Sequence, residues 1–392
     1  MKILKVFDKY KIIDEIGLEG SPSTNTIAVA MSGGVDSSVT AAILVECGYN
    51  VVGLSMHLYE HKLNVNNKRT CCAGLDISDA RLVADKLKIP HYVLNYSNRF
   101  NEQVIKDFTD SYLKGETPIP CVRCNQTVKF VDMFNYAKKL GANALATGHY
   151  IKRKIVDGRP ELHRAKDLTK DQSYFLFATT TEQLEYLRFP LGGFDKSQIR
   201  SIAKNYGLKV ADKPDSQDIC FVPEGKYSDL VRKLRPSAVM PGDIIHIDGT
   251  VLGKHNGIID YTVGQRKGLK IGGRKGYNNS DTILYVIKID HEKNQIFVGP
   301  KKNLGCKEVK LKDCNWIINN FSKELSVLVK FRNSFEPVPA KVFRDFDKNT
   351  SNIILNKPQI GISPGQAAVF YGLTDKAQVY GGGWINHTSL SV

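Results

Sequence analysis

One stretch of the sequence constrains the fold more than any other, because a buried strand, a glycine turn and an apolar helix follow one another without interruption. Residues 26–31 (TIAVAM) form a short apolar run, and residues 32–38 (SGGVDSS) follow it. Residues 38–47 have the apolar spacing of a helix, and Gly48 is placed to end it. Residues 50–56 then have the pattern of a second buried strand. This order predicts a parallel βαβ unit.

The same alternation continues along the front of the chain. Helical spacing recurs over residues 76–88, 101–113 and 127–140, whereas residues 91–96 and 143–150 have strand patterns. Strands that alternate with helices form a parallel sheet covered on both faces, with ligands at the carboxyl ends of the strands. We therefore predict an α/β fold that begins with a Rossmann-like domain.

The residue composition and its patterning change near residue 226, which predicts a different architecture for the residues that follow. Glycine and β-branched residues dominate there, and residues 240–257 and 281–299 have hairpin patterns with polar turns. From about residue 300, further segments of strand length follow at turn spacing, which predicts a small antiparallel barrel. The expected domains are a catalytic domain over 1–225, a small, mostly β central domain over 226–299, and a C-terminal β-barrel over 300–392.

Charge is distributed unevenly along the chain. Its 392 residues include 55 Lys and Arg and 40 Asp and Glu, a formal net charge of +15. Residues 1–225 have 30 basic and 26 acidic side chains, whereas residues 226–392 have 25 and 14. A basic, compact protein favours polyanionic partners, nucleic acid first, and the asymmetry assigns that partner to the rear half. The alternative is a surface tuned only for solubility.

The lack of a membrane-spanning run and of a targeting pattern predicts the cellular compartment and the state of the cysteines. No apolar run approaches the roughly 18 residues that cross a bilayer, and acidic residues interrupt the lysine-rich N-terminus. We therefore expect no membrane partner and a cytoplasmic location. Eight cysteines in such a chain predict thiols used for packing, metal ligation or catalysis rather than a disulfide framework.

The glycine turn has the groups that bind phosphate. The paired glycines Gly33 and Gly34 let backbone N–H groups approach a phosphate, and the start of the helix adds positive potential. Neighbouring serines supply hydroxyl groups, and Asp36 is placed to hold Mg²⁺ against the phosphates. The sequence contains no GxxxxGK[ST] motif, which excludes a Walker-type phosphoryl-transfer loop.

Several motifs resemble a known family. SGGVDSS after a strand is similar to the PP-loop of the ATP-pyrophosphatase superfamily, whose members adenylate a carbonyl oxygen and release pyrophosphate. Residues 117–130 (TPIPCVRCNQTVKF), 170–177 (KDQSYFLF) and 215–223 (DSQDICFVP) narrow the resemblance. Together with ATGHY, YTVGQRKGL and PGQAAVFY, they resemble the tRNA-specific 2-thiouridylase family from about residue 26 to residue 384.

This resemblance implies ATP-dependent 2-thiolation of the wobble uridine, position 34 of tRNA. ATP would adenylate the uracil O2, and a cysteine persulfide would deliver sulfur to C2, with release of AMP and pyrophosphate. Cys220 matches the persulfide position, and Cys124 matches the second thiol, which attacks the persulfide and leaves a disulfide. Because a thiolate is the nucleophile, both sulfurs need lowered pKa values or positive neighbours such as Arg123, Lys129 and Lys213.

The resemblance also implies the remaining site residues and partners. Partners are ATP with Mg²⁺, tRNAs for Lys, Glu and Gln, and a persulfide donor such as a cysteine desulfurase or a sulfur relay protein. The basic segment 151–170 is a further candidate phosphate contact. The expected ATP site is Ala30, Met31, Ser32, Gly33, Gly34, Val35, Asp36, Ser37, Met56 and Gly148. The expected tRNA contacts are Ile119, Pro120, Cys121, His149, Lys170, Asp171, Gln172, Arg332, Asn333 and Gln366.

One departure from the family pattern leaves a metal alternative open. Many relatives have an aspartate three residues before the nucleophile, where this chain has Cys121. Cys121, Cys124 and Cys220 are therefore a candidate ligand set for an iron–sulfur cluster. A closed zinc site that uses Cys71 and Cys72 is a further alternative, although adjacent cysteines lack the usual ligand spacing. Metal-free thiol chemistry is favoured.

Two other function classes remain at this point. An amidating synthetase of the same superfamily would need the PP-loop but neither cysteine, and an RNA-binding module would need only the basic barrel. An enzyme that modifies a stacked wobble base must flip it into a pocket that excludes water. We therefore expect residues 115–127 and 212–223 to be mobile lids.

Overall fold

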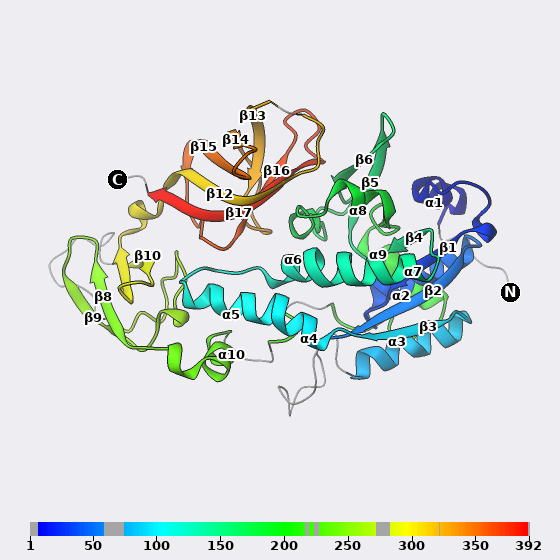
Figure 1. Ribbon diagram of the computed structural model, residues 1–392, viewed down its shortest axis with the longest axis horizontal. Coiled ribbons are helices and arrows are strands. Elements are labelled where there is room, and N and C mark those ends of the chain that lie inside the picture. Colours follow the sequence, from blue (N-terminus) through cyan, green and yellow to red (C-terminus); the bar gives the residue numbers. More distant parts are fainter. Residues whose placement is uncertain are drawn as a thin grey trace. The chain divides into compact units, whose positions relative to one another are not determined.

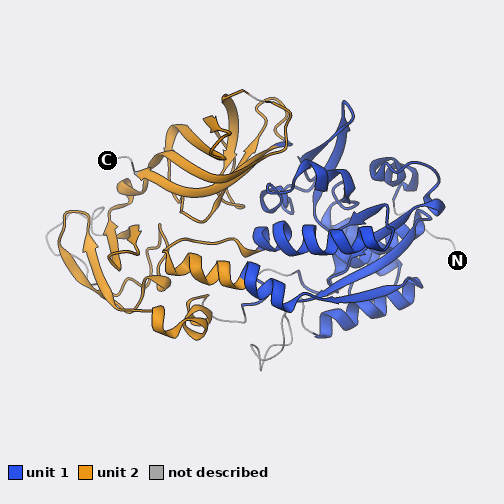
Figure 2. Cartoon of the chain, in the orientation of Figure 1, with its two compact units in different colours: residues 1–104, 121–224, 377–379 blue, residues 105–120, 225–376, 380–392 orange. Residues whose placement is uncertain are grey.

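The chain folds into two compact units (Figure 2). The first unit comprises residues 1–104, 121–224 and 377–379, and the second comprises 105–120, 225–376 and 380–392. Residues 105–120 thus belong with the rear of the chain, which no sequence pattern indicates. The computed structural model describes residues 7–58, 74–215, 219–222, 227–271, 283–320 and 322–390.

A five-stranded parallel sheet organises the first unit and confirms the predicted fold class (Figure 1). Its order is β3-β2-β1-β4-β7, so β1 is the central strand. Ile27 of β1 is aligned with Val51 of β2 and with Ala144 of β4. The strands are β1 Thr26–Ala30, β2 Asn50–His57, β3 His91–Asn95, β4 Ala144–Ala146 and β7 Leu187–Arg188.

Burial explains why β1 and the helix after it form so readily. Ile27, Ala28 and Val29 have no solvent exposure, as expected of a central strand covered on both faces. Helix α2 (Val35–Glu46) has nine buried residues among its twelve, because it contacts β1, β2, α3 and α9. The other helices of this unit, apart from those below, are α1 Lys9–Ile16, α3 Gly74–Leu87, α8 Thr181–Tyr186 and α9 Lys196–Asn205.

Two predicted helices are longer than expected, and each contains π-helical turns. The helix predicted over 127–140 begins seven residues earlier, as α6 (Pro120–Cys124), and continues through η4 (Asn125–Met133) into α7 (Phe134–Lys139). Residues 120–127 of the expected lid over 115–127 are helical, and the mobility of this segment stays a prediction. Part of the other expected lid, 216–218 and 223, lies outside the described residues. The helix predicted over 101–113 is α4 Ser97–Phe100, η3 Asn101–Ile105 and α5 Lys106–Leu113.

The second unit contains a small sheet and a closed barrel. The small sheet has the order β10-β11-β8-β9, in which β11 and β8 are parallel and the other pairs antiparallel. Six strands close the antiparallel barrel, because β12 pairs with both β15 and β17. The elements are α10 Tyr227–Leu234, β8 Gly242–His246, β9 Val251–His255, β10 Tyr285–Asp290, β11 Gln295–Gly299, β12 Cys306–Trp316, β13 Glu324–Lys330, β14 Val338–Asp345, β15 Thr350–Gln359, β16 Ala367–Tyr371 and β17 Gln378–Leu390.

The basic segment 151–170 begins with a hairpin, β5 (Ile151–Val156) and β6 (Arg159–Arg164). Gly158 occupies the turn with a positive φ of 74°. Across the described parts of the chain, no helix has the length and apolar character that a bilayer crossing requires.

Candidate active site

The glycine turn lies where a parallel sheet binds its ligands. Residues 32–34 follow β1, and Gly148 follows β4, the strand beside it. The sheet extends from β1 in both directions, so its carboxyl edge has a topological switch point between these two strands. A Cβ on Gly148 would lie 2.9 Å from backbone atoms of Asp36 and Ser37, so glycine permits this close approach.

Hydrogen bonds within the turn hold the start of α2 in place. Ser37 Oγ accepts from the Ser32 N–H at 3.1 Å and donates to the Gly34 carbonyl at 3.2 Å. Ser38 Oγ donates to the same carbonyl at 2.8 Å. Gly33 has a φ of 73°, and a Cβ there would lie 2.0 Å from the Asp76 carbonyl oxygen. The turn therefore requires glycine at position 33 for two independent reasons.

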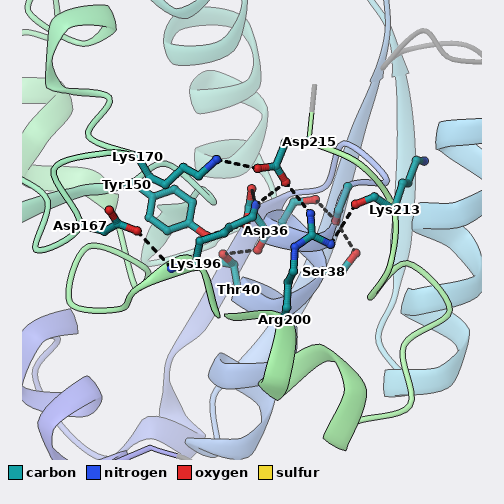
Figure 3. A network of polar contacts seen from close by, with 12 residues as sticks. Asp36, Ser38, Thr40, Tyr150, Asp167, Lys170, Lys196, Arg200, Lys213 and Asp215 are labelled. Carbon is teal, nitrogen blue, oxygen red and sulfur yellow. Dashed lines mark hydrogen bonds and ion pairs between the residues drawn. The ribbon is translucent and has the colours of Figure 1, made fainter. Parts of the chain in front are cut away.

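Asp36 is ion-paired in this structure (Figure 3). Lys196 Nζ lies 2.8 Å from each of its carboxylate oxygens, and the Tyr150 hydroxyl donates to Oδ1 at 2.7 Å. Burial and the adjacent Asp36 carboxylate raise the pKa of Tyr150, so the phenol remains a donor. Lys196 begins α9 and is 160 residues from Asp36 in the sequence.

A second carboxylate, Asp215, shares that lysine. Asp215 contacts Lys196, Lys170 and Arg200, each at 2.9 Å (Figure 3). Burial by itself would raise the pKa of Asp215, but the ion pairs with Lys170 and Lys196 lower it to about 2. The carboxylate is therefore charged at any physiological pH. Lys170, expected as a tRNA contact, is part of this network.

Lys213, two residues before Asp215, links this part of the chain to the glycine turn. Its ammonium group donates to the Gly33 carbonyl at 3.0 Å, to Asp76 at 2.5 Å and to Asp79 at 2.7 Å. Burial opposes its charge, but the two carboxylates outweigh burial and raise the pKa of Lys213. The expected role of Lys213 as a positive neighbour of Cys220 is therefore not what the structure shows, because its charge is committed to these partners.

The two candidate cysteines are thiols in the first unit. Both are partly exposed, and Cys124 lies where α6 passes into η4. Burial raises the pKa of Cys124 to about 12; Lys129 opposes this shift, while Cys220 and Cys121 add to it. Cys220 thus acts on Cys124 electrostatically. Of the two conditions expected for this sulfur, a lowered pKa or a positive neighbour, Cys124 has the neighbour Lys129, but desolvation outweighs it.

The structure describes the residues of one of the two metal alternatives. Wherever the structure describes the chain, no group of three His, Cys, Asp or Glu side chains is gathered as metal ligands. Cys121, Cys124 and Cys220 are all described, so they do not form the cluster site considered above. Cys71 and Cys72 lie outside the described residues.

The other expected ATP residues lie at the same edge of the sheet. Met56 is the second-last residue of strand β2, which pairs with β1. Met31 follows β1, is buried, and its carbonyl accepts from Ser55 Oγ at 2.6 Å. His91 Nε2 lies 2.8 Å from the same hydroxyl. Burial lowers the pKa of His91, so a neutral imidazole supports the backbone before the turn.

The residues expected to contact tRNA in the first unit have mixed environments. Asp171 is buried and accepts from Arg164, the Ala165 N–H and Ser173, so its side chain orders the loop. Gln172 Oε1 accepts from the Tyr150 N–H at 2.8 Å. Other members of this set are more accessible: Cys121 is exposed, and His149, whose pKa burial lowers well below its usual range, is partly exposed. Direct contact with tRNA stays a prediction for each.

In the second unit, the expected contacts gather near an extended segment before α6. Gln366 Nε2 donates to the Thr117 carbonyl at 2.8 Å, and the Thr117 N–H donates to the Pro364 carbonyl at 2.8 Å. Ile119 and Pro120 are buried. Elsewhere in this unit, the guanidinium of Arg332 lies 5.6 Å from the ring centre of Phe335, and Asn333 is exposed.

Sequence reasoning missed the cations and carboxylates that surround the loop. Lys196, Arg200, Tyr150 and Asp215 were not candidates, because none is part of a phosphate-binding pattern. Tyr150 and Asp215 do stand inside the quoted segments ATGHY and DSQDICFVP, so proximity to a motif was the available signal.

Comparison with known proteins covers almost the whole chain. Residues 25–224 match the family described as tRNA methyl transferase HUP domain, residues 228–300 its PRC-barrel domain, and residues 306–385 the aminomethyltransferase beta-barrel domain. Among solved structures, NMN synthetase from Francisella tularensis aligns with a TM-score of 0.35 and 16% identity, covering 58% of this chain and 84% of that one. That likeness is too distant to bear on function.

Full-length relatives identify the family more closely. The chain is 53% identical over 380 residues to a tRNA-specific 2-thiouridylase from Rhodospirillum centenum, covering 97% of this chain and 96% of that protein. It is 51% identical over 382 residues to a tRNA-specific 2-thiouridylase from Parvibaculum lavamentivorans, covering 96% and 94%. With this identity along nearly its entire length, and with the glycine turn, Cys124 and Cys220 in one unit, the chain belongs to the tRNA-specific 2-thiouridylase family.

Proposed function

We propose that the protein catalyses the ATP-dependent 2-thiolation of uridine 34 in tRNA. The observation that carries the proposal is that Cys124 and Cys220 belong to the same unit as the phosphate-binding turn and act on one another electrostatically. Family membership supports the reaction class, since the relatives are tRNA-specific 2-thiouridylases. The amidating alternative leaves this pair of thiols without a role.

The reaction uses the two thiols in sequence. Uracil O2 attacks the α-phosphorus of ATP, and the bond to pyrophosphate breaks. The terminal sulfur of a Cys220 persulfide then bonds to C2. The Cys124 thiolate attacks Cys220 Sγ, so the S–S bond breaks, the outer sulfur stays on C2, and AMP leaves. The resulting Cys124–Cys220 disulfide takes two electrons from a thiol reductant before the next turnover.

ATP is held, in this proposal, at the start of α2. Backbone N–H groups of residues 32–38 and the helix N-terminus bind phosphate oxygens. Mg²⁺ enters with ATP, and Asp36 is the carboxylate of the turn that would hold it. Asp36 is paired with Lys196 before ATP binds, and phosphate and Mg²⁺ together offer both groups replacement partners of the correct charge.

The protonation of Cys124 makes the thiol step dependent on substrate. With a pKa of about 12, almost all Cys124 is protonated at neutral pH, and a thiol is a poor nucleophile. We infer that tRNA binding changes the surroundings of this sulfur and lowers its pKa. This dependence keeps the thiol unreactive between turnovers.

The rear of the chain is proposed to hold the tRNA. Residues 226–392 have an excess of eleven positive charges, and part of this region forms the closed barrel. The central region over 226–299 and the barrel over 300–392 are treated as separate domains. The sulfur donor is a persulfide carrier such as a cysteine desulfurase or a relay protein, and tRNAs for Lys, Glu and Gln are the expected substrates.

The test is mass spectrometry of tRNA nucleosides after incubation with ATP, Mg²⁺ and a persulfide source. We expect 2-thiouridine at position 34 with the wild type, and none with Cys124→Ser or Cys220→Ser, while pyrophosphate release continues. Cys47→Ala is the matched control, because Cys47 is buried among apolar residues of the first unit. Full turnover by the double serine variant would falsify the proposal. Wild-type protein that binds tRNA but releases no pyrophosphate would instead favour an RNA-binding module.

A further inference from the structure

Asp215 stands five residues before Cys220 and is bound more firmly than an ordinary loop carboxylate. Its oxygens contact Lys170, which follows β6, and Lys196 and Arg200, which are on α9. Lys196 and Asp215 have side-chain exposures of only 12% and 24%, so solvent screens their attraction weakly. The contact with three cations is consistent with the lowered pKa of Asp215.

The backbone next to Asp215 is fastened as well. Arg200 donates through Nη1 to the carbonyls of Ala211 at 2.8 Å and Lys213 at 3.1 Å. Lys213 in turn donates to the Gly33 carbonyl of the glycine turn. Residues 211–215 are therefore held by charge-assisted hydrogen bonds to α9 on one side and to the phosphate-binding turn on the other.

The chain is anchored again just after Cys220. Phe221 is buried, and its ring meets the fully buried ring of Phe100 edge-on, with 5.6 Å between the centres. Five residues span at most about 18 Å when fully extended, so an anchored Asp215 confines Cys220 to that radius. One anchor is ionic and the other apolar, which means that only the first responds to charge.

The ionic anchor shares a lysine with the nucleotide site. Lys196 contacts both Asp215 and Asp36, the carboxylate of the glycine turn (Figure 3). Phosphates bound at that turn bring several negative charges to the same cation. The three hydrogens of the Lys196 ammonium group are already engaged, by two contacts to Asp36 and one to Asp215, so a phosphate oxygen that binds Lys196 must replace one of these contacts.

We propose that Asp215 is a positioning residue that fastens the Cys220 segment to the ATP site, and that nucleotide binding loosens this hold. The inference rests on the proposed function, in which Cys220 carries the sulfur. In this proposal, the ion pair between Asp215 and Lys196 couples ATP binding to the position of the Cys220 sulfur. Asp215 acts through its cations and does not itself touch the reacting atoms.

The experiment measures the rate at which iodoacetamide alkylates Cys220 in the full-length protein, with exposed Cys121 as the internal reference. In the wild type we expect MgATP to raise the Cys220 rate about tenfold, the change produced by losing one charge-assisted hydrogen bond. Asp215→Asn should have the raised rate without ATP and no further response to it. Asp215→Glu, which keeps the charge, should restore the response in part.

Asp212→Asn is the matched control. It removes the same charge three residues away, where Asp212 is 81% exposed and pairs only at the surface with Lys204. This variant should respond to ATP as the wild type does. In turnover, Asp215→Asn should lower kcat for thiolation by a larger factor than it raises KM for ATP, and thermal unfolding should show both variants folded.

Two results would overturn the inference. One is a Cys220 alkylation rate in Asp215→Asn that equals the wild-type rate and still responds to ATP. The other is an equal effect of Asp212→Asn, which would reduce the role of Asp215 to general electrostatics. Alkylation needs neither tRNA nor a persulfide, so its outcome is independent of the nucleoside analysis that tests the proposed function.

Discussion

At the scale of single residues, the local environment determines the protonation state of a side chain, which the residue type alone does not. Cys124 has a basic neighbour in sequence, Lys129, yet burial dominates and raises its pKa to about 12. Asp215 is also partly buried, but contact with Lys170 and Lys196 lowers its pKa to about 2. Burial disfavours charge in both, and only the carboxylate has enough direct cationic partners to overcome it.

The raised pKa of Cys124 predicts a steep pH dependence of its reactivity. A group titrating at about 12 gains thiolate about tenfold per pH unit through the neutral and mildly alkaline range. Alkylation of Cys124 in the substrate-free protein, followed by peptide mass spectrometry from pH 7 to pH 9, should therefore rise by about two orders of magnitude. A rate that levels off near pH 7 would mean that the thiol is already activated.

At the scale of elements, the unit of β1, glycine turn and α2 combines phosphate chemistry with tight packing. The hydroxyl of Ser37 occupies a hydrogen-bonding position between Ser32 and Gly34, and Gly33 lies against the backbone of Asp76. The sequence predicted this unit closely because its signals are local: an apolar run, a glycine pair and helical spacing occur within about twenty residues.

Substitution of Gly33 by alanine tests the packing of the turn. A Cβ there would lie 2.0 Å from the Asp76 carbonyl oxygen, so the turn must move, and displacement of a catalytic group by about 1 Å costs about 100-fold in rate. ATP-dependent pyrophosphate release should fall by that order. Gly158→Ala is the control, because its φ of 74° matches that of Gly33 while nothing lies within 4 Å of the added methyl group. Equal losses in both variants would attribute the effect to backbone strain alone.

Two strands show where local signals end. β7 has two residues, Leu187–Arg188, too few for any pattern to register. β12 (Cys306–Trp316) is long and closes the barrel, but irregularities interrupt its pairing with β17 at three places. Those bulges break the alternation of buried and exposed side chains that identifies a half-buried strand. The sequence around β12 therefore lacks the regular alternation that would identify it as a strand.

At the scale of the whole molecule, charge is segregated along the chain. The net charge is +4 over residues 1–225 and +11 over residues 226–392. In the front half, the structure shows where part of the positive charge goes: Lys196, Arg200 and Lys213 are paired with carboxylates around the site. The excess of positive charge after residue 226 is therefore the charge available to bind a polyanion.

The salt dependence of tRNA binding measures that excess. Each lysine that contacts a phosphate adds about 0.7 to 0.9 to the slope of log K against log salt concentration. Alanine in place of exposed lysines of the rear half should lower that slope and leave ATP affinity unchanged, and a slope equal to that of the wild type would count against the barrel as the tRNA-binding region. The test positions are Lys301, Lys307 and Lys310, and the matched exposed lysines of the first unit are Lys9, Lys11 and Lys88.

The sequence alone established the parallel α/β architecture, the glycine turn, the two cysteine segments and the family, because each of these is written in contiguous residues. Only the tertiary structure determined which charged side chains of the site contact one another. Asp36 meets Lys196 across 160 residues of chain, and that lysine also contacts Asp215. The protonation state of Cys124 could not be predicted from the sequence either, since a pKa depends on burial and on the charges that packing brings near. Such contacts form only when the chain closes on itself, and no local pattern records them.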